Sequence, residues 1–404
     1  MPGRRVLIAP ADIVITLTLR LSSHLCRNPA MNKLCAKIVE LWKAANISPV
    51  VRNVQPGETG TILVCVTRNE GWRLPCFLDH HRMLGVRHFV FIDNGSSDTT
   101  VEFLSGQPDT DLYFCGDTFS SLAQRAWRHK VMAVYGHHRW YLNLDADEHL
   151  IYDGMGEKSL DDVTALLEKE SNPRPRGVLV DLYGSGSQKD YLHLDTCLQM
   201  IAYCRYFDGD GYTEYCSKHR VRLTGGVRAR MFRQTGYTGH EPALAKYPLA
   251  FFTEEDLIVS GHHMYPAHKN FLSESVLGLL HYKFSKPDFM KIDDALKRQV
   301  YAKNSEEYQL YARWFAENPE GSFHYPGSVE FTSPDDLIKA GLIGRLPWGE
   351  RTPANATMLN WTSLENWRDG RKREKILRYL RAKLKGLGKK ADFPMLVGDH
   401  KIPS

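Results

Sequence analysis

Short apolar stretches that each end in a cluster of polar residues constrain the fold of this chain more than any other feature. Ile62 to Val66 and His88 to Ile92 are two such stretches, and both are rich in β-branched or aromatic side chains. The amphipathic segment from Trp72 to Leu84 separates them and Gly85 follows it, so the order predicts strand, helix, strand. Strands that are apolar on both faces are typical of parallel sheets covered by helices on both sides. We therefore predict an α/β fold with a mainly parallel, Rossmann-like sheet and flanking helices.

The same alternation continues through the middle of the chain and then weakens. The expected strands are Leu112–Cys115, Trp140–Leu144 and Val178–Leu182, and the expected helices are Leu122–Tyr135 and Leu160–Glu170. After Tyr183 we interpret 184–221 as a loop, Gly225–Arg233 as a basic strand and Leu277–Phe284 as a further apolar run with a polar end. Beyond Lys286 the pattern becomes helical and polar.

The run Asp145-Ala146-Asp147-Glu148 directly follows one of the predicted strands. Three carboxylates so close together repel one another unless a cation neutralises them. Magnesium prefers one or two carboxylates, several waters and the phosphate oxygens of a substrate. The run therefore predicts a metal site that a diphosphate completes; the alternative is a solvated acidic turn.

Two further polar clusters follow neighbouring strands of the same predicted sheet. Asp93 could accept hydrogen bonds from a base or ribose, Gly95 permits a positive φ, and Ser96 and Ser97 could cap the next helix. The simpler alternative is a helix-capping turn. Thr67 to Glu70 forms the third cluster. Because parallel strands end at one edge of the sheet, where α/β proteins bind ligands, we expect a ligand crevice there.

Taken in order, these clusters resemble the successive motifs of a known family. Val66 to Glu70, Phe91 to Thr99 and Leu144 to His149 look like those of glycosyltransferase family 2-like enzymes, in the subgroup whose first motif is Arg-Asn-Glu. The resemblance covers roughly residues 61 to 290. It extends to Gly225-Gly226-Val227-Arg228, Lys246-Tyr247-Pro248-Leu249 and Leu279-Leu280-His281-Tyr282-Lys283.

The resemblance implies a GT-A fold, in which a nucleotide-binding half joins an acceptor half. It also implies a nucleoside-diphosphate sugar donor, a divalent cation (Mn²⁺ or Mg²⁺) and inversion at the anomeric carbon. Carried over residue by residue, it places Thr67, Arg68, Glu70, Asp93 and Asn94 at the nucleoside, and Lys246 and Lys283 at the diphosphate. It places Asp145 near the ribose and the metal, Asp147 on the metal directly, and His281 as a further metal ligand.

An inverting transfer also needs a base that takes the proton of the acceptor hydroxyl. This chain lacks the Glu-Asp or Asp motif that many relatives carry in the expected form. Glu241, after Gly239-His240, is our first candidate for the base. The remaining candidates are Glu254, Glu255, Asp256 and Asp210.

The charge distribution divides the 404 residues into a near-neutral body and a basic tail. We expect an N-terminal extension of unclear role (1–60), a catalytic domain (61–290) and a helical C-terminal region (291–404). Eleven basic and two acidic residues lie between Arg368 and Lys390, whereas the whole chain carries a formal charge of +5. Leucines at helical spacing within this segment predict a basic amphipathic helix that lies on an anionic membrane. The alternatives are a helix packed on the domain and a tail that adheres to RNA.

Composition narrows the class of protein further. No apolar run approaches the ~20 residues of a membrane span, and a near-neutral body does not favour a nucleic-acid-binding protein. The eight cysteines include no Cys-x-x-Cys pair, so we expect no structural zinc site and a reducing compartment, with the protein cytoplasmic or peripheral on the inner face of the plasma membrane.

The sequence therefore predicts an inverting, metal-dependent glycosyltransferase that acts on a glycan or lipid-linked acceptor in surface polysaccharide or glycolipid synthesis. Two alternatives stay open. A nucleotidyltransferase would make the nucleotide sugar, and a non-catalytic protein would only bind it.

Overall fold

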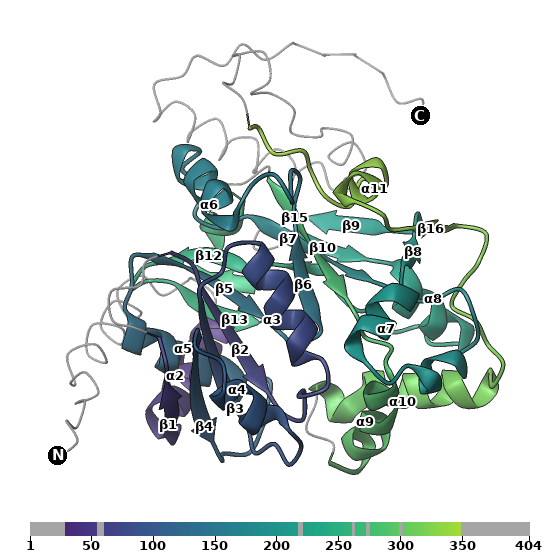
Figure 1. Cartoon of the computed structure of the whole chain (residues 1–404), viewed down its shortest axis with the longest axis horizontal. Coiled ribbons are helices and arrows are strands. Elements are labelled where there is room, and N and C mark those ends of the chain that lie inside the picture. Colours follow the sequence, from purple (N-terminus) through teal and green to yellow (C-terminus); the bar gives the residue numbers. More distant parts are fainter. Residues whose placement is uncertain are drawn as a thin grey trace, which may run out of the picture. The chain divides into compact units, whose positions relative to one another are not determined.

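A computed structural model describes residues 29–54, 60–216, 221–260, 263–271, 275–298 and 302–348 (Figure 1). These residues belong to one compact unit. The basic amphipathic helix that we expect between Arg368 and Lys390 lies outside the described residues.

The central sheet has six strands in the order β1-β4-β3-β2-β5-β12. The inner strands β4 (Thr110–Cys115), β3 (His88–Asp93), β2 (Ile62–Thr67) and β5 (Arg139–Leu144) run parallel. The edge strands β1 (Ile47–Arg52) and β12 (Leu249–Phe252) are antiparallel to their neighbours. The predicted α/β fold with a mainly parallel sheet is confirmed.

Helices cover both faces of this sheet, as the apolar strands predict (Figure 1). Leu63 and Cys65 of β2 pack with α3 (Leu74–Met83) and α6 (Leu160–Lys169) in one core. Ile62 and Val64 pack with α5 (Ala123–Tyr135) in a second core. α2 (Pro29–Ala44) lies against α5, and the short α4 (Thr100–Ser105) follows β3. Alternate strand residues therefore serve two different cores.

A second sheet, ordered β11-β7-β15-β6, begins where the first one ends. β6 (Glu148–Ile151) starts directly after the acidic run at the end of β5 and pairs with β15 (Val276–His281). β15 is parallel to β7 (Arg176–Asp181), and β11 (Ala245–Lys246) pairs with β7. The acidic run Asp145–Glu148 therefore links the two sheets, because it follows β5 of the first sheet and leads into β6 of the second.

Two predictions beyond Tyr183 are wrong. The segment 184–221 is not a loop, because it contains η1 (Asp190–His193), α7 (Cys197–Tyr203), β8 (Tyr206–Asp208) and β9 (Thr213–Cys216), and Val221 begins β10 (Val221–Thr224). β8 pairs with β16 (Ser328–Glu330), a partner far away in sequence that no local pattern reveals.

The predicted basic strand at Gly225–Arg233 is instead the helix α8 (Gly226–Gln234). Its buried residues Val227, Met231 and Phe232 have the spacing of one helical face. Gly225, whose φ of 128° favours glycine, stands at the start of the helix.

The remaining elements complete the same unit. They are β13 (Leu257–Ser260), β14 (His263–Tyr265), η2 (Ala267–Phe271), α9 (Lys286–Arg298), α10 (Ala302–Glu317) and α11 (Pro334–Lys339). The helical pattern expected after Lys286 is confirmed in α9 and α10, which pack against each other. Among the described helices, none combines the length and the apolar character that crossing a membrane requires.

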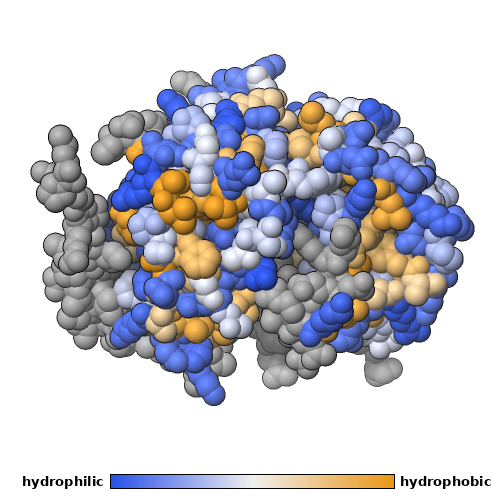
Figure 2. Space-filling model, turned by 60° about the horizontal axis from the view of Figure 1, so that its bottom comes forward, coloured by the Kyte–Doolittle hydropathy of each residue, from blue (hydrophilic) through white to orange (hydrophobic). Residues whose placement is uncertain are grey.

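The surface alternates apolar and hydrophilic patches. Figure 2 shows one face on which hydrophobic residues form several separate patches among hydrophilic ones. Leu198 is the most exposed large hydrophobic residue among those described, at 72%.

Cys76 and Cys197 form a disulfide that joins α3 to α7. Such bonds are typical of oxidising compartments, so this pair departs from the free thiols that a reducing compartment implies. The location of the protein stays a prediction.

Candidate active site

The acidic run and the end of β15 bring together three side chains that could hold a metal ion. Asp147, Glu148 and His281 each offer one ligand atom, and these atoms lie within 4.8 Å of one another. The register of the second sheet explains the meeting, since His281 pairs with Glu148 across the β15–β6 ladder.

A buried carboxylate fixes the ring of His281. Nδ1 of His281 lies 2.5 Å from Asp181 Oδ1, and Arg228 donates a hydrogen bond of 2.7 Å to the other oxygen of Asp181. Burial opposes protonation of His281, but Asp147 and Asp181 outweigh it and raise its pKa. Burial likewise opposes ionisation of Asp181, yet Arg228 and His281 lower its pKa to about 2. This arrangement directs Nε2 toward Asp147, at 3.3 Å from Oδ2.

These residues fit a divalent cation. Two carboxylates and one imidazole nitrogen suit a metal such as Mn²⁺ or Mg²⁺, which commonly takes its remaining ligands from phosphate oxygens and water. A ligating histidine commonly gives its other ring nitrogen to a carboxylate, as His281 does with Asp181. Burial disfavours the charged form of Asp147, but His281 and Arg73 hold its pKa well below the usual range. The carboxylate is therefore in its ligating form.

Asp145 lies outside this group, although the resemblance implies that it approaches the metal. Its carboxylate accepts a hydrogen bond of 2.7 Å from Arg128 and lies 3.6 Å from Lys246, and its side chain is 49% exposed. Burial raises its pKa less than Lys246 and Arg128 lower it, so the net shift is downward. Glu148 takes the place in the metal group that we expected for Asp145. The physical reason is that Arg128 holds one carboxylate oxygen of Asp145, whereas the pairing of β6 with β15 sets Glu148 opposite His281.

Lys246 is one of the residues that line a pocket beside this group. The pocket has a volume of about 510 Å³ including its open mouth, and α5, the end of β5 and the β13–β14 hairpin enclose it. Lys246 pairs with both Asp145 and Glu148. The residues that line the pocket are Gln124, Arg125, Arg128, Asn143, Asp145, Glu148, Lys246, Tyr247, Pro248, Ile258 and Met264.

Sequence reasoning missed the cations that α5 supplies to this pocket. Arg125 donates a hydrogen bond of 2.8 Å to the carbonyl of Val259, and burial together with Arg128 lowers the pKa of Arg125 to about 10. Arg128 Nε and Asn143 Oδ1 are buried without a hydrogen-bond partner in the described part of the chain. The sequence did contain a signal for these pocket residues: Gln124 and Arg128 stand at positions i and i+4, on one face of the helix that precedes the acidic run.

The ends of β2 and β3 place the expected nucleoside residues side by side. Thr67 lies opposite Asp93 in the parallel ladder, and the backbone N–H of Asn94 donates to the carbonyl of Thr67 at 2.9 Å. Arg68 donates to the Asn94 carbonyl at 3.1 Å. Thr67 Oγ1 and Asn94 Oδ1 are buried and have no hydrogen-bond partner within the described residues.

The carboxylate of Asp93 is hydrogen-bonded within the turn that follows β3. It accepts hydrogen bonds from the backbone N–H groups of Gly95 at 3.0 Å and Ser96 at 3.1 Å, and another from the Ser96 hydroxyl. This is the turn that we named as the simpler alternative. Gly95, at a φ of 74°, leaves its Cβ position open to a radius of 4 Å.

A buried arginine connects the first motif to the metal group. Arg73 lies 3.0 Å from Glu70, 2.7 Å from Asp288 and 3.7 Å from Asp147, and its side chain is 3% exposed. Glu70 is thereby drawn toward Arg73. Sequence reasoning missed this residue, whose one local signal is its position three residues after Glu70.

The structure does not bring the candidate bases to the metal group. Glu241 lies 2.7 Å from Arg233. Asp256 is buried against Arg174 at 2.6 Å, and the others have partners of their own: Glu254 with His138, Glu255 with Lys269, and Asp210 with Tyr325. Within the described residues, no hydrogen bond or ion pair links any of these carboxylates to Asp147, Glu148 or His281. The identity of the base stays a prediction.

Comparison with known proteins gives weak likenesses only. No family model and no curated protein matches the chain. A solved structure of TarS from S. aureus matches with a TM-score of 0.24 and 13% identity over 30% of this chain and 21% of that one. A structure of TarS residues 1–349 matches with a TM-score of 0.23 and 13% identity over 31% of this chain and 36% of that one. The chain thus spans about a fifth and about a third of the length of these two chains.

A crystal structure of 4-diphosphocytidyl-2C-methyl-D-erythritol synthase matches more of the chain. It has a TM-score of 0.25 and 9% identity over 70% of this chain and 98% of that one. Likenesses at this level do not indicate an activity.

Proposed function

We propose that this protein is a metal-dependent, inverting glycosyltransferase of GT-A type that uses a nucleoside-diphosphate sugar. The observation that carries the proposal is the meeting of Asp147, Glu148 and His281 at the carboxyl edge of a mainly parallel sheet. Ligands of open α/β sheets bind at this edge. The ordered sequence motifs supply the reaction class.

The cations around this edge match the charge of the donor. Lys246, Arg125 and Arg128 line the larger pocket, and the pocket borders Asp145 and Glu148. Negative charge grows on the nucleoside diphosphate as the glycosidic bond breaks, and preorganised cations stabilise that charge. Arg128 and Lys246 now neutralise Asp145 and Glu148, so a diphosphate held by the metal would compete with these carboxylates for them.

The chain's own residues have distinct tasks in this reaction. A bound divalent cation supplies charge stabilisation at the diphosphate. Asp147 and Glu148 would hold it, and Asp181 orients His281 through Nδ1. The resemblance places Thr67 and Asn94 at the nucleoside, and both stand at the ends of β2 and β3. We keep Glu241 as the proposed base, because its side chain is a quarter exposed and a change of partner from Arg233 would free it.

A substitution at Asp147 tests the proposal. We expect wild-type protein to hydrolyse or transfer at least one nucleotide sugar from a panel when Mn²⁺ or Mg²⁺ is present. Asp147→Asn should lower the turnover by at least a hundredfold, because a neutral amide binds the cation weakly. Asp79→Asn, on the exposed surface of α3, is the matched control and should keep wild-type turnover. Full activity of Asp147→Asn in a folded protein would refute the metal role.

A nucleotidyltransferase is the second candidate function, since an α/β sheet with a basic pocket also suits a nucleoside triphosphate. The turn after the first strand, Thr67 to Gly71, lacks the glycine-rich basic loop that such enzymes usually carry. Release of pyrophosphate from a triphosphate and a sugar phosphate would favour this candidate over transfer. A protein that binds a nucleotide sugar with metal and shows no turnover would instead be a binding protein.

The proposal also includes the acceptor of the sugar and the location of the protein in the cell. We propose a glycan or lipid-linked acceptor and a cytoplasmic or inner-membrane-surface location, on the basis of the basic segment Arg368–Lys390 in the sequence. Sedimentation with anionic vesicles, compared between the full chain and a chain ending at Glu350, tests the membrane contact.

A further inference from the structure

Lys246 lies where the chain crosses a second time between the two sheets. β11, which contains Lys246, pairs with Gly177 and its neighbour in the second sheet, and β12 of the first sheet follows shortly after it. The backbone N–H of Asn143, near the end of β5, donates to the carbonyl of Pro248 at 2.8 Å. This crossing therefore runs beside the acidic run, and the backbone of both sheets holds Lys246 there.

The ammonium of Lys246 contacts one carboxylate of the metal group (Asp147, Glu148 and His281) and one carboxylate outside it. It forms an ion pair with Glu148 and lies 3.6 Å from Oδ2 of Asp145. Burial opposes the charge of Lys246, but Glu148 and Asp145 outweigh the burial and raise its pKa. The ammonium therefore stays charged, although the side chain is only 14% exposed.

A divalent cation and Lys246 would compete for Glu148. Two cations beside one carboxylate repel each other, and the repulsion is strong where little water screens it. Arg73 also pairs with the metal group, but it is held by Glu70 and Asp288 as well. Lys246 is thus the cation that a divalent ion at Glu148 would displace.

The side chain of Lys246 can leave Glu148 while the backbone stays in place. Lysine carries its ammonium on a flexible four-carbon stem, so the charge can move on its own. Lys246 also lines the larger pocket, to which Arg125 and Arg128 add two further cations. A diphosphate bound beside them would offer the ammonium a new anionic partner.

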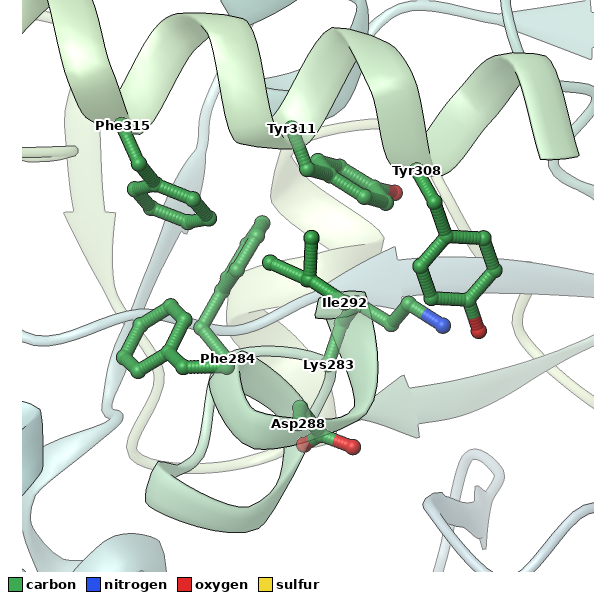
Figure 3. A pocket seen from close by; sticks show the side chains of 8 residues that line it. Lys283, Phe284, Asp288, Ile292, Tyr308, Tyr311 and Phe315 are labelled. Atoms are coloured by element: carbon green, nitrogen blue, oxygen red, sulfur yellow. The ribbon is translucent and has the colours of Figure 1, made fainter. Parts of the chain in front are cut away.

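The other lysine that the resemblance places at the diphosphate has different surroundings. Lys283 lines an aromatic pocket between the end of β15 and the helices α9 and α10, and Figure 3 shows its side chain directed toward Tyr308. Its ammonium lies 5.4 Å from the centre of that ring. Burial opposes the charge of Lys283, but Asp147 and Glu307 are among the groups that raise its pKa. Of these two lysines, Lys246 is the one that forms an ion pair with the metal group in the described part of the chain.

We propose that Lys246 couples the binding of the metal to the binding of the donor: it competes with the divalent cation for Glu148 and passes to the diphosphate when the cation binds. The inference rests on the proposed glycosyl transfer and adds a role in two binding steps. While Lys246 pairs with Glu148, it weakens the binding of the cation; once displaced, it strengthens the binding of the diphosphate. Because such linkage is reciprocal, each ligand raises the affinity for the other.

Binding of Mn²⁺ alone to the full chain tests the competition. We expect Lys246→Met to bind Mn²⁺ at least tenfold more tightly than wild-type protein, because the variant leaves Glu148 without the competing ammonium. Lys246→Arg keeps the charge, so its affinity should stay within about threefold of wild type. The electron paramagnetic resonance signal of free Mn²⁺ measures the affinity. Equal or weaker binding by Lys246→Met would overturn the proposal.

Two further variants separate this competition from a general effect of charge. Lys189→Met removes the same charge from an exposed ion pair with Glu320 and should leave the Mn²⁺ affinity unchanged. Arg128→Met removes a cation that holds Asp145, outside the metal group, and should tighten Mn²⁺ binding less than Lys246→Met does. An equal rise in affinity in these two variants would contradict the role of Lys246. Lys246→Gln is the second neutral variant if Lys246→Met does not fold.

A nucleotide titration tests the second step. At a Mn²⁺ concentration that saturates each protein, isothermal titration calorimetry measures the affinity for whichever nucleoside diphosphate of a panel the wild-type protein binds most tightly. We expect Lys246→Met to bind it at least tenfold more weakly, because the diphosphate loses a cationic partner. Tighter Mn²⁺ binding and weaker nucleotide binding are opposite changes, which a general loss of folding would not produce. An unchanged nucleotide affinity would overturn the coupling.

The wild-type titrations separate this inference from the proposed function. If wild-type protein binds a nucleoside diphosphate in the presence of Mn²⁺ but Lys246→Met fails either test, the coupling is refuted and the glycosyltransferase stands. If wild-type protein binds no nucleoside diphosphate in the presence of Mn²⁺, the proposed function is refuted and the coupling with it.

Discussion

At the scale of single residues, Arg73 connects more of the candidate site than any residue that the sequence pointed to. It contacts Glu70, Asp147 and Asp288 while almost fully buried. Burial opposes its charge, but Asp288 and Glu70 outweigh the burial and raise the pKa of Arg73. The guanidinium therefore stays charged among these three carboxylates.

We predict that Arg73→Met destabilises the protein by about 3–5 kcal/mol, because it leaves buried carboxylates without their cation. Urea unfolding followed by circular dichroism measures the loss. Arg87→Met is the control: its ion pair with Asp161 is exposed, and such pairs contribute ~0–1 kcal/mol. Equal losses in the two variants would show that Arg73 has no special role.

At the scale of elements, the Cys76–Cys197 disulfide joins a helix that the sequence predicted to a helix that it did not predict. α3 belongs to the predicted strand-helix-strand unit, whereas α7 lies in the segment that we expected to be a loop. The bond closes a loop across a sequence separation of 121 residues. In the chain-entropy account, a crosslink over a long loop stabilises the fold by restricting the unfolded chain.

We predict that reduction of this disulfide lowers the free energy of unfolding by about 2–5 kcal/mol. Urea unfolding with and without dithiothreitol measures the difference. A Cys76→Ser/Cys197→Ser double variant should show the same loss and no response to dithiothreitol. Identical stability of wild-type protein under both conditions would mean that the two thiols are not bonded in solution.

At the scale of the whole molecule, neutral histidines are distributed through the cores on both faces of the sheet. Burial lowers the pKa of His80, His81 and His149 on the α3 side. Burial, with a contribution from His137, also lowers the pKa of His129 on α5 to about 4. His129 Nε2 accepts a hydrogen bond of 2.8 Å from the backbone of Ile258, which requires the neutral ring. His281 has the opposite shift, since its pKa is raised.

These shifts predict that stability falls as the pH drops from 7.5 toward 4.5. A histidine with a lowered folded pKa contributes its full stability above its unfolded pKa of ~6.5 and loses it as the pH falls through the folded pKa. His281 opposes this trend, because its raised pKa stabilises the fold at low pH, but the pKa is lowered in five histidines, the four above and His137. Each extra proton bound by the unfolded chain costs about 1.4 kcal/mol per pH unit.

Urea unfolding at pH 7.5, 6.5, 5.5 and 4.5 measures the slope. His129→Gln should flatten the part of the slope below pH 6.5, since the amide oxygen can accept the Ile258 hydrogen bond without titrating. A stability that rises between pH 6.5 and 4.5 would contradict the assignment of neutral buried histidines.

The sequence by itself determined the four parallel strands of the central sheet and the place of the acidic run. Apolar strands such as Ile62–Val66 are local signals, because residues that alternate between two covered faces must all be apolar. The helices α3, α5 and α6 were predicted from the helical spacing of apolar residues and from the residues that end helices, which are local signals as well. The meeting of Asp147 with His281 was anticipated from a motif resemblance, since no periodicity links residues so far apart.

Only the tertiary structure decided which partner each polar side chain takes. Asp145 turns to Arg128 and Lys246, Glu148 joins the metal group, and Arg73 reaches Asp147 across the junction of the two sheets. Ion pairs form between charged groups that lie close together in space. That distance depends on how sheets and helices pack, so local sequence spacing does not reveal it. The same holds for β8, whose partner β16 lies far along the chain, and for the aromatic pocket between β15, α9 and α10.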